Sequence, residues 1–196
     1  MPEDTQLSDS DGVFLVKTAR MAVTEFLSNG KRMKLESEGE KKFSFNSGVF
    51  VTLNNADGLR GCIGFPMPDK KLSHGIIDAA IAAATEDPRF SPVKINELNE
   101  IVFEITVLTP PVEITVTDPM EYLEKIKVGR DGLIIRNSFS SGLLLPQVPV
   151  EYGWNVEEFL QHTCEKAGLE KDTWKNEKVK IEKFEGIVYK EKTNGS

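Results

Sequence analysis

The chain has 196 residues, and 24 lysines and arginines against 31 aspartates and glutamates give it a formal net charge of −7. This length suits one large domain or one domain in two lobes. The acidic total disfavours a general binder of nucleic acids or of anionic membranes, because both need a basic surface. No apolar run approaches the ~20 residues of a membrane-spanning helix, and the acidic N-terminus does not resemble a signal peptide. Two cysteines cannot form a disulfide scaffold for a domain of this size, so we expect a cytoplasmic protein with reduced thiols.

Both ends of the chain are polar and predict disordered tails over residues 1–10 and 191–196, which leaves one domain over residues 11–190. The first element of that domain is predicted to be a helix over about 12–28, since apolar residues recur there at helical spacing. The expected cap and stop of this helix are Ser10 or Asp11 and Gly30. The charged stretch 31–42 predicts a polar helix or a mobile loop.

A β-hairpin is predicted next, because two β-prone runs over 49–53 and 59–63 are separated by five turn-forming residues. A second helix is predicted over about 72–86, ended by Pro88. Its alanine-rich interior would let its backbone lie close against a sheet or another helix. A strand over 101–109 follows, in which every second residue is apolar and faces one side.

The second half of the chain alternates between short strands and helices. Extended segments are predicted over 112–116, 132–136, 142–145, 178–184 and 187–189. Helices are predicted over about 119–125 and from Asn155 to just before Gly168, each with a capping-box acid at its third position. Hairpins interleaved irregularly with about four helices indicate an α+β fold with an antiparallel or mixed sheet.

The densest chemical signal is the run Gly58-Leu59-Arg60-Gly61-Cys62-Ile63-Gly64 in the predicted hairpin. Glycines inside a strand indicate a bulge or the close approach of another group. A cysteine between small neighbours could be reached by a ligand, and a nearby guanidinium would favour its nucleophilic thiolate. The alternation of strand faces argues against Arg60 as that activating group. The competing interpretation is a packed structural Cys62, since free cysteine is among the most buried residue types.

This motif resembles the signature of the AMMECR1 domain family, in the form of an uncharacterised archaeal-type, single-domain member. Ordered matches extend from about Val13 to Tyr189 and include residues 79–84, 87–92, 104–108, 128–133, 144–148 and 166–169. The resemblance implies an α+β domain of two unequal lobes with a groove between them. It implies no established reaction. Family members are often encoded beside Memo-like and radical-SAM proteins, which suggests a functional link to them.

Three further residues are candidates for ligand binding or for local structure. Arg89 could hold a substrate carboxylate or phosphate, but a local pair with Glu86 or Asp87 is favoured. Arg130, between two glycines, predicts a tight turn rather than an anion site. The segment 145–149 is predicted to be rigid and extended, and the resemblance makes Gln147 a candidate groove residue.

The two histidines, His74 and His162, leave a Cys–His pair open. His162 is a weak catalytic candidate beside Cys62, whereas His74 at a helix start suggests a capping or surface role. Cys164 lies on the predicted apolar stripe of the last helix and is expected in the core. The spacing of cysteines and histidines does not fit a structural zinc site, so no metal and no other cofactor is predicted.

Two functions remain open. In the first, Cys62 is the nucleophile or redox thiol of an enzyme that acts on a small polar substrate, with Arg60, Gly61, Gly64, Arg89 and Gln147 lining the groove. In the second, the same surface is a binding or adaptor module for a protein partner or a small ligand. An exposed edge of the second predicted hairpin, over 132–145, would also permit a homodimer.

Overall fold

The computed structural model describes residues 7–176 and 179–192 and divides into two compact units. Unit 1 contains the described residues up to Leu108 and from Ile187 onward, and unit 2 runs from Thr109 to Gly186. Helices and antiparallel strands occur in both, so the predicted α+β class is confirmed. None of the described helices is long and apolar enough to cross a membrane. Most of the two predicted tails (residues 1–6 and 193–196) lies outside the described residues.

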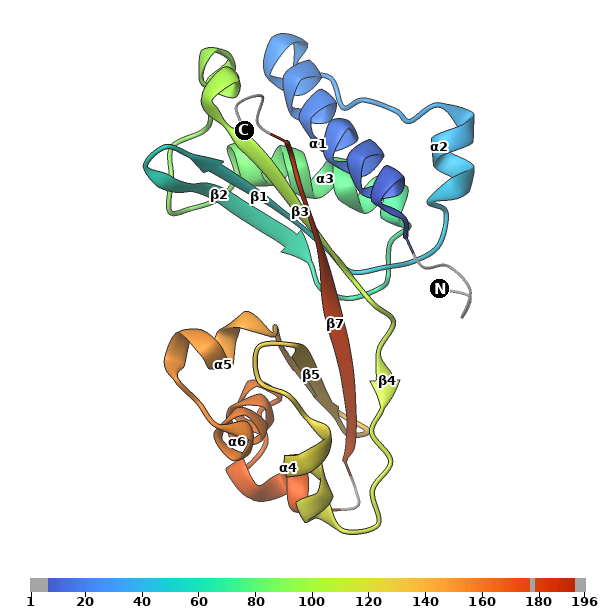
Figure 1. The fold of residues 1–196 in the computed structure, drawn as a ribbon, viewed down its shortest axis with the longest axis vertical. Coiled ribbons are helices and arrows are strands. Elements are labelled where there is room, and N and C mark those ends of the chain that lie inside the picture. The colour runs from blue at the N-terminus through green and yellow to red at the C-terminus, as the bar shows by residue number, and fades with distance from the viewer. Residues whose placement is uncertain (1–6, 177–178, 193–196) are drawn as a thin grey trace. The chain divides into compact units, whose positions relative to one another are not determined.

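Unit 1 consists of a sheet and two long helices on one of its faces (Figure 1). Its elements are α1 (Asp9–Asn29), α2 (Ser37–Lys42), β1 (Val49–Asn55), β2 (Gly58–Phe65), α3 (Leu72–Thr85), the 3₁₀ helix η1 (Ile95–Glu100), β3 (Val102–Leu108) and the end of β7 (Lys180–Lys190). The strand order is β2-β1-β3, followed by β7. The edge strand is therefore β2, which carries the cysteine motif.

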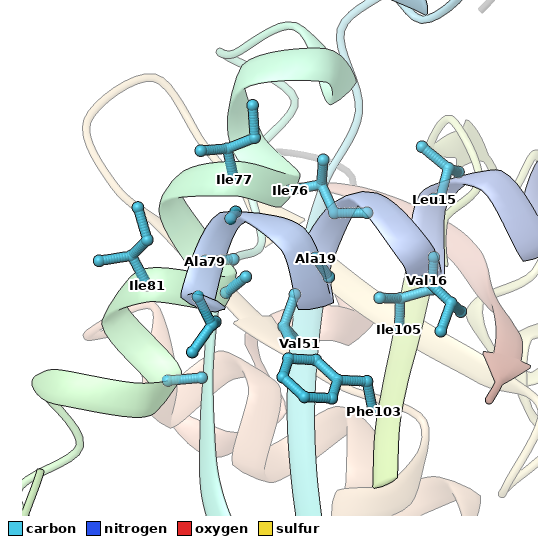
Figure 2. Packing of buried hydrophobic residues seen from close by; sticks show 14 of the residues in the cluster. Leu15, Val16, Ala19, Val51, Ile76, Ile77, Ala79, Ile81, Phe103 and Ile105 are labelled. Carbon is cyan, nitrogen blue, oxygen red and sulfur yellow. The ribbon is translucent and has the colours of Figure 1, made fainter. Parts of the chain in front are cut away.

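The core of unit 1 lies between this sheet and the helices α1 and α3. Figure 2 shows that Leu15, Val16 and Ala19 of α1 and Ile76, Ile77 and Ala79 of α3 pack with Val51 of β1 and with Phe103 and Ile105 of β3. Alternate residues of β1 and β3 are buried, as the strand pattern predicts. The residues between them lie on the opposite sheet face and are partly exposed, which leaves room for chemistry there.

Helix α1 begins three residues earlier than predicted. Its cap is Ser8, whose hydroxyl accepts from the N–H of Asp11, while the Asp11 carboxylate accepts from the N–H of Ser8. Asp11 is therefore the third residue of a capping box rather than the cap. The predicted stop is confirmed, because Gly30 adopts a left-handed conformation with φ of 71°.

Unit 2 has its own core. Its elements are β4 (Val112–Glu113), η2 (Pro119–Glu121), α4 (Tyr122–Lys125), β5 (Asp131–Arg136), β6 (Ser141–Leu144), α5 (Gln147–Tyr152), α6 (Val156–Lys166), η3 (Lys171–Lys175) and the first part of β7. Strand β5 pairs with β6 on one side and with β7 on the other. Phe159 and Leu160 of α6 pack with Trp174 and Leu133 in this core.

Two predictions in unit 2 are wrong. The segment 145–149 is not extended, because α5 begins at Gln147. Pro146 caps this helix, and Pro149 lies in its first turn, where the missing N–H would have no helical partner. The two predicted strands at the end of the chain are one strand, β7, that continues through Gly186. It does so because its earlier residues pair with β5 and its last residues lie beside β3.

Candidate functional site

The hairpin that carries Cys62 is longer and tighter than its sequence suggests. β1 and β2 extend towards each other until only Ala56 and Asp57 remain between them. Leu53 pairs with Gly61, but Asn54 pairs with Leu59, so Arg60 is an extra residue that forms a β-bulge. The predicted hairpin is therefore confirmed, but its predicted five-residue loop is a two-residue turn, and the bulge lies in the strand, two residues before Cys62.

The glycines of the motif are accounted for by packing within unit 1. A Cβ atom on Gly61 would lie 2.2 Å from the carbonyl oxygen of Ala83, so Gly61 lets the alanine-rich helix α3 approach β2. A Cβ atom on Gly64 would lie 2.3 Å from the ring of Phe50, its partner across the strands. Gly58 has a positive φ of 112° at the turn. A ligand-binding role for Gly61 and Gly64 stays a prediction.

Cys62 lies on the sheet face opposite the helices and is partly exposed. Its neighbour across the strands is Thr52, whose Oγ1 lies 3.3 Å from the Cys62 Sγ. Thr52 in turn pairs with Glu104 on β3. The register therefore aligns a thiol, a hydroxyl and a carboxylate in one row across three strands.

The backbone of Cys62 is held by an aspartate–arginine pair in which the aspartate is buried and the arginine is exposed. The Cys62 N–H donates to Asp87 Oδ2 at 2.8 Å, and Arg89 Nη2 donates to the Cys62 carbonyl at 3.4 Å. Arg89 also donates from Nε and Nη2 to the two Asp87 oxygens, at 3.0 and 2.7 Å. The favoured local pair of Arg89 is thus present. These Arg89 bonds, together with the N–H of Cys62, hold the pKa of Asp87 well below its usual range although the residue is only 5% exposed.

Arg60 is separated from the thiol by its own ion pair. Its Nε donates to Glu97 Oε2 at 2.9 Å, and its Nη1 donates to the carbonyl of Ser91. The predicted separation by alternating strand faces is wrong, because Arg60 and Cys62 are two positions apart and a regular strand would place both side chains on the same face. The bulge and the pair with Glu97 fix Arg60 instead.

Gln147 and His162 belong to unit 2, whereas Cys62 belongs to unit 1. Gln147 is exposed at the start of α5. His162 lies 2.7 Å from Glu165 through its Nδ1, and its ring stacks on Trp154 with a centroid distance of 3.9 Å. The approach of either residue to Cys62, like the groove expected between the lobes, stays a prediction.

The remaining candidates have local structural roles. Burial raises the pKa of the Cys164 thiol to about 11, and the residue is fully buried in the core of unit 2, as predicted. His74 lies 3.5 Å from Glu40 at the start of α3. Arg130 donates to the buried Asp131, next to the left-handed Gly129 of the predicted turn.

Sequence reasoning missed Thr52, Asp87 and Glu104 as neighbours of Cys62. The hairpin pattern predicts pairing of the two strands, but the bulge at Arg60 shifts the register by one residue, and register decides which residue faces the thiol. Asp87 was predicted as a partner of Arg89, but no local pattern in the sequence indicates that it also accepts from the Cys62 N–H.

Comparison with known proteins gives consistent matches over nearly the whole chain. The family model described as AMMECR1 matches residues 16–189. Protein MJ0810 of Methanocaldococcus jannaschii is 51% identical over 187 residues, which cover 94% of this chain and 92% of that protein. Protein PYRAB00100 of Pyrococcus abyssi is 48% identical over 191 residues, which cover 95% and 93%.

A solved structure supports the fold. The crystal structure of the uncharacterized protein PH0010 from Pyrococcus horikoshii is 48% identical in sequence and superimposes with a TM-score of 0.77. The match covers 95% of this chain and 94% of that one. The names of these relatives state no reaction and no ligand, so any function for the row around Cys62 has to be argued from its geometry.

Proposed function

The chain belongs to the AMMECR1 family, and from that premise we propose that unit 1 carries a thiol centre in which Cys62 is the nucleophile for a small anionic substrate. The observation that carries this proposal is the juxtaposition of a partly exposed thiol with the Thr52 hydroxyl at 3.3 Å and with Arg89, which is bonded to the carbonyl of the same cysteine. Arg89 can hold the anionic end of a substrate close to the cysteine, and the partly exposed sulfur can then act as the nucleophile.

Arg89 has the geometry of an anion-binding residue. Its Nε and Nη2 are occupied by Asp87 and by the Cys62 carbonyl, whereas no described residue accepts a hydrogen bond from its Nη1. The side chain is 55% exposed. The Asp87 pair therefore fixes the guanidinium plane while one edge stays open to a carboxylate or phosphate.

The row across the sheet supplies two further groups. The Thr52 hydroxyl can donate to the sulfur as negative charge develops on it. Glu104, one strand further along, brings a carboxylate to the same sheet face about 10 Å from the cysteine backbone, if adjacent strands are about 4.8 Å apart. A substrate long enough to span this distance would meet both the nucleophile and a carboxylate.

The test compares an anionic and a neutral alkylating reagent of nearly the same size, iodoacetate and iodoacetamide, on the folded protein. We expect Arg89 to raise the relative rate of iodoacetate at Cys62, and we expect Arg89→Gln to lower that relative rate about tenfold, the effect of roughly one charge-assisted hydrogen bond. Arg60→Gln is the matched control, because Arg60 lies two residues from Cys62 but is held by Glu97.

Peptide mass spectrometry distinguishes Cys62 from Cys164 and measures the rate at which each reagent modifies Cys62. If the ratio of the iodoacetate rate to the iodoacetamide rate falls in Arg89→Gln and is unchanged in Arg60→Gln, the result supports an anion site beside the nucleophile. Equal effects of the two variants would point to general electrostatics of the hairpin, and the proposed role of Arg89 would then be wrong.

The alternative function, a binding or adaptor module, is constrained by the same contacts. A partner that added a strand to the edge of β2 would need its free N–H and C=O groups, and at Cys62 these groups are already bonded to Asp87 and Arg89. A substitution at Gly61, such as Gly61→Val, is unsuitable as a test of partner binding, because the added Cβ would collide with the Ala83 carbonyl oxygen and disturb the fold. Capture of a partner that survives Cys62→Ala and is lost in Arg89→Gln would favour the adaptor.

A further inference from the structure

A cavity of about 690 Å³ in unit 1 lies between α1 and the segment 33–43, and none of the residues around Cys62 lines it. Its volume is in the range of small-molecule sites. Five of its lining side chains are large and apolar: Phe14, Met21, Met33, Leu35 and Phe43. The rings of Phe14 and Phe43 stack with centroids 5.4 Å apart. The cavity therefore offers an apolar, partly aromatic wall to the flat or linear body of a ligand.

One polar group in this wall lacks a partner. Thr18 lines the cavity from the middle of α1 and is 4% exposed. Three other helical threonines, Thr24, Thr85 and Thr163, donate their hydroxyls to the carbonyl four residues earlier. No such bond, and no other hydrogen bond to a described residue, is formed by the Thr18 hydroxyl. The hydroxyl itself is not fully buried, so it is reached from the cavity, where a ligand oxygen can bond to it in place of water.

The rim of the cavity is acidic. Glu25, Glu36 and Glu38 line it, are exposed, and form no ion pair within the described part of the chain. The two lysines of the lining differ: Lys42 is paired with Asp11 at 2.5 Å, and Lys34 has no such pair among the described residues. Among the described residues, three carboxylates at the rim therefore have no ion-pair partner, against one such ammonium group. A positively charged ligand group is therefore favoured there over a negatively charged one.

We propose that this cavity binds a small organic amine that has a single aromatic ring or a short aliphatic chain as its body and a hydroxyl or carbonyl oxygen at the end far from the amine. The body packs against Phe14, Met33 and Phe43, the oxygen bonds to the Thr18 hydroxyl, and the ammonium group lies among the glutamates of the rim. This site is separate from the proposed thiol centre and does not depend on it.

Three probes of one shape separate the parts of this proposal. Tyramine carries both the ammonium group and the far hydroxyl, phenethylamine lacks the hydroxyl, and hydroxyphenylpropionate carries a carboxylate in place of the amine. Calorimetric titration of the full chain should show tyramine as the tightest of the three, with about a five- to tenfold advantage over phenethylamine, the usual effect of one neutral hydrogen bond.

Thr18→Val keeps the shape of the side chain and removes its hydroxyl, so it should abolish the advantage of tyramine over phenethylamine. Thr24→Val is the matched control, because Thr24 lies on the same helix with its hydroxyl already bonded to the Arg20 carbonyl, and it should keep that advantage. The double variant Glu36→Gln, Glu38→Gln, at exposed positions that leave the fold intact, should weaken both amines and not the acid.

Each other outcome rejects a defined part of the proposal. Tighter binding of hydroxyphenylpropionate would overturn the assignment to an amine. Binding of tyramine that none of the three variants changes would place the ligand elsewhere on the protein. No binding of any probe at millimolar concentration would reject the cavity as a site for this class of molecule.

Discussion

The two cysteines of this chain show how differently one residue type behaves in its two units. Cys62 lies on the edge strand of unit 1, partly exposed, between the Thr52 hydroxyl and the anchored guanidinium of Arg89. Cys164 lies on α6 of unit 2, fully buried, in contact with an apolar core. The difference teaches that reactivity here follows from position in the fold, because an edge strand with an uncovered face leaves a thiol accessible and a buried helix stripe does not.

The largest expected effect is on chemical modification. Cys62 should react with iodoacetamide in the folded protein at least about a hundredfold faster than Cys164, since Cys164 becomes accessible only when unit 2 opens. Burial also keeps its thiol protonated, with a pKa of about 11. Mass spectrometry of both peptides over a time course measures the ratio. Similar rates would mean that unit 2 opens far more readily than its packing implies.

The next effect concerns stability. Cys164→Ala should lower the free energy of unfolding by about 2 kcal/mol, because it leaves a small cavity and deprives the Trp174 backbone N–H of the sulfur that accepts it. Cys62→Ala, at a partly exposed position, should cost less than about 1 kcal/mol. Denaturant titration of both variants checks this order, and the reverse order would make Cys62 the packing residue.

Asp87 gives a prediction that depends on pH. Because the carboxyl pKa is lowered in the folded protein, the stabilisation that it provides is present above the unfolded value of about 3.9 and is lost as the pH falls through the folded value. Asp87→Asn should therefore cost roughly 1.5 kcal/mol near neutral pH, and this difference should shrink as the solution is acidified. Thermal unfolding in steps from pH 7 down to pH 2 measures it. A difference that stays constant would mean that the lost interaction does not involve the charge.

The smallest effect is expected for Thr52→Val, which removes the hydroxyl beside the sulfur and keeps the β-branched shape. The stability should change by no more than about 0.5 kcal/mol. The alkylation rate of Cys62 should fall by a factor of about two to three, because the thiolate loses one weak hydrogen bond. An unchanged rate would show that Thr52 only packs against the sulfur.

The elements that sequence predicts well are those whose signals are local. The capping box at Asn155, the left-handed Gly30 and the alternation over 101–109 each depend on a few neighbouring residues. The helix α5 was missed because two prolines indicate extended structure, whereas one of them caps the helix and the other lies in its first turn.

The site was harder to predict because it depends on register and on contacts distant in sequence. Cys62 was recognised from its motif, but its neighbours come from β1, from β3 and from the corner after α3. A single bulged residue, Arg60, determines that Cys62 pairs with Thr52. No periodicity in the sequence encodes the position of that bulge.

The division of the chain has a consequence for its synthesis. Unit 2 is an insertion between β3 and the last strand of unit 1, so unit 1 is completed only by residues near the C-terminus. Glu191 accepts from Arg20 on α1 at 2.6 Å, and the Tyr189 ring occupies the space that a side chain at Gly12 would need. During synthesis these contacts of β7 with α1 therefore form only after the whole of unit 2 has been made, so unit 2 can fold before unit 1 is complete.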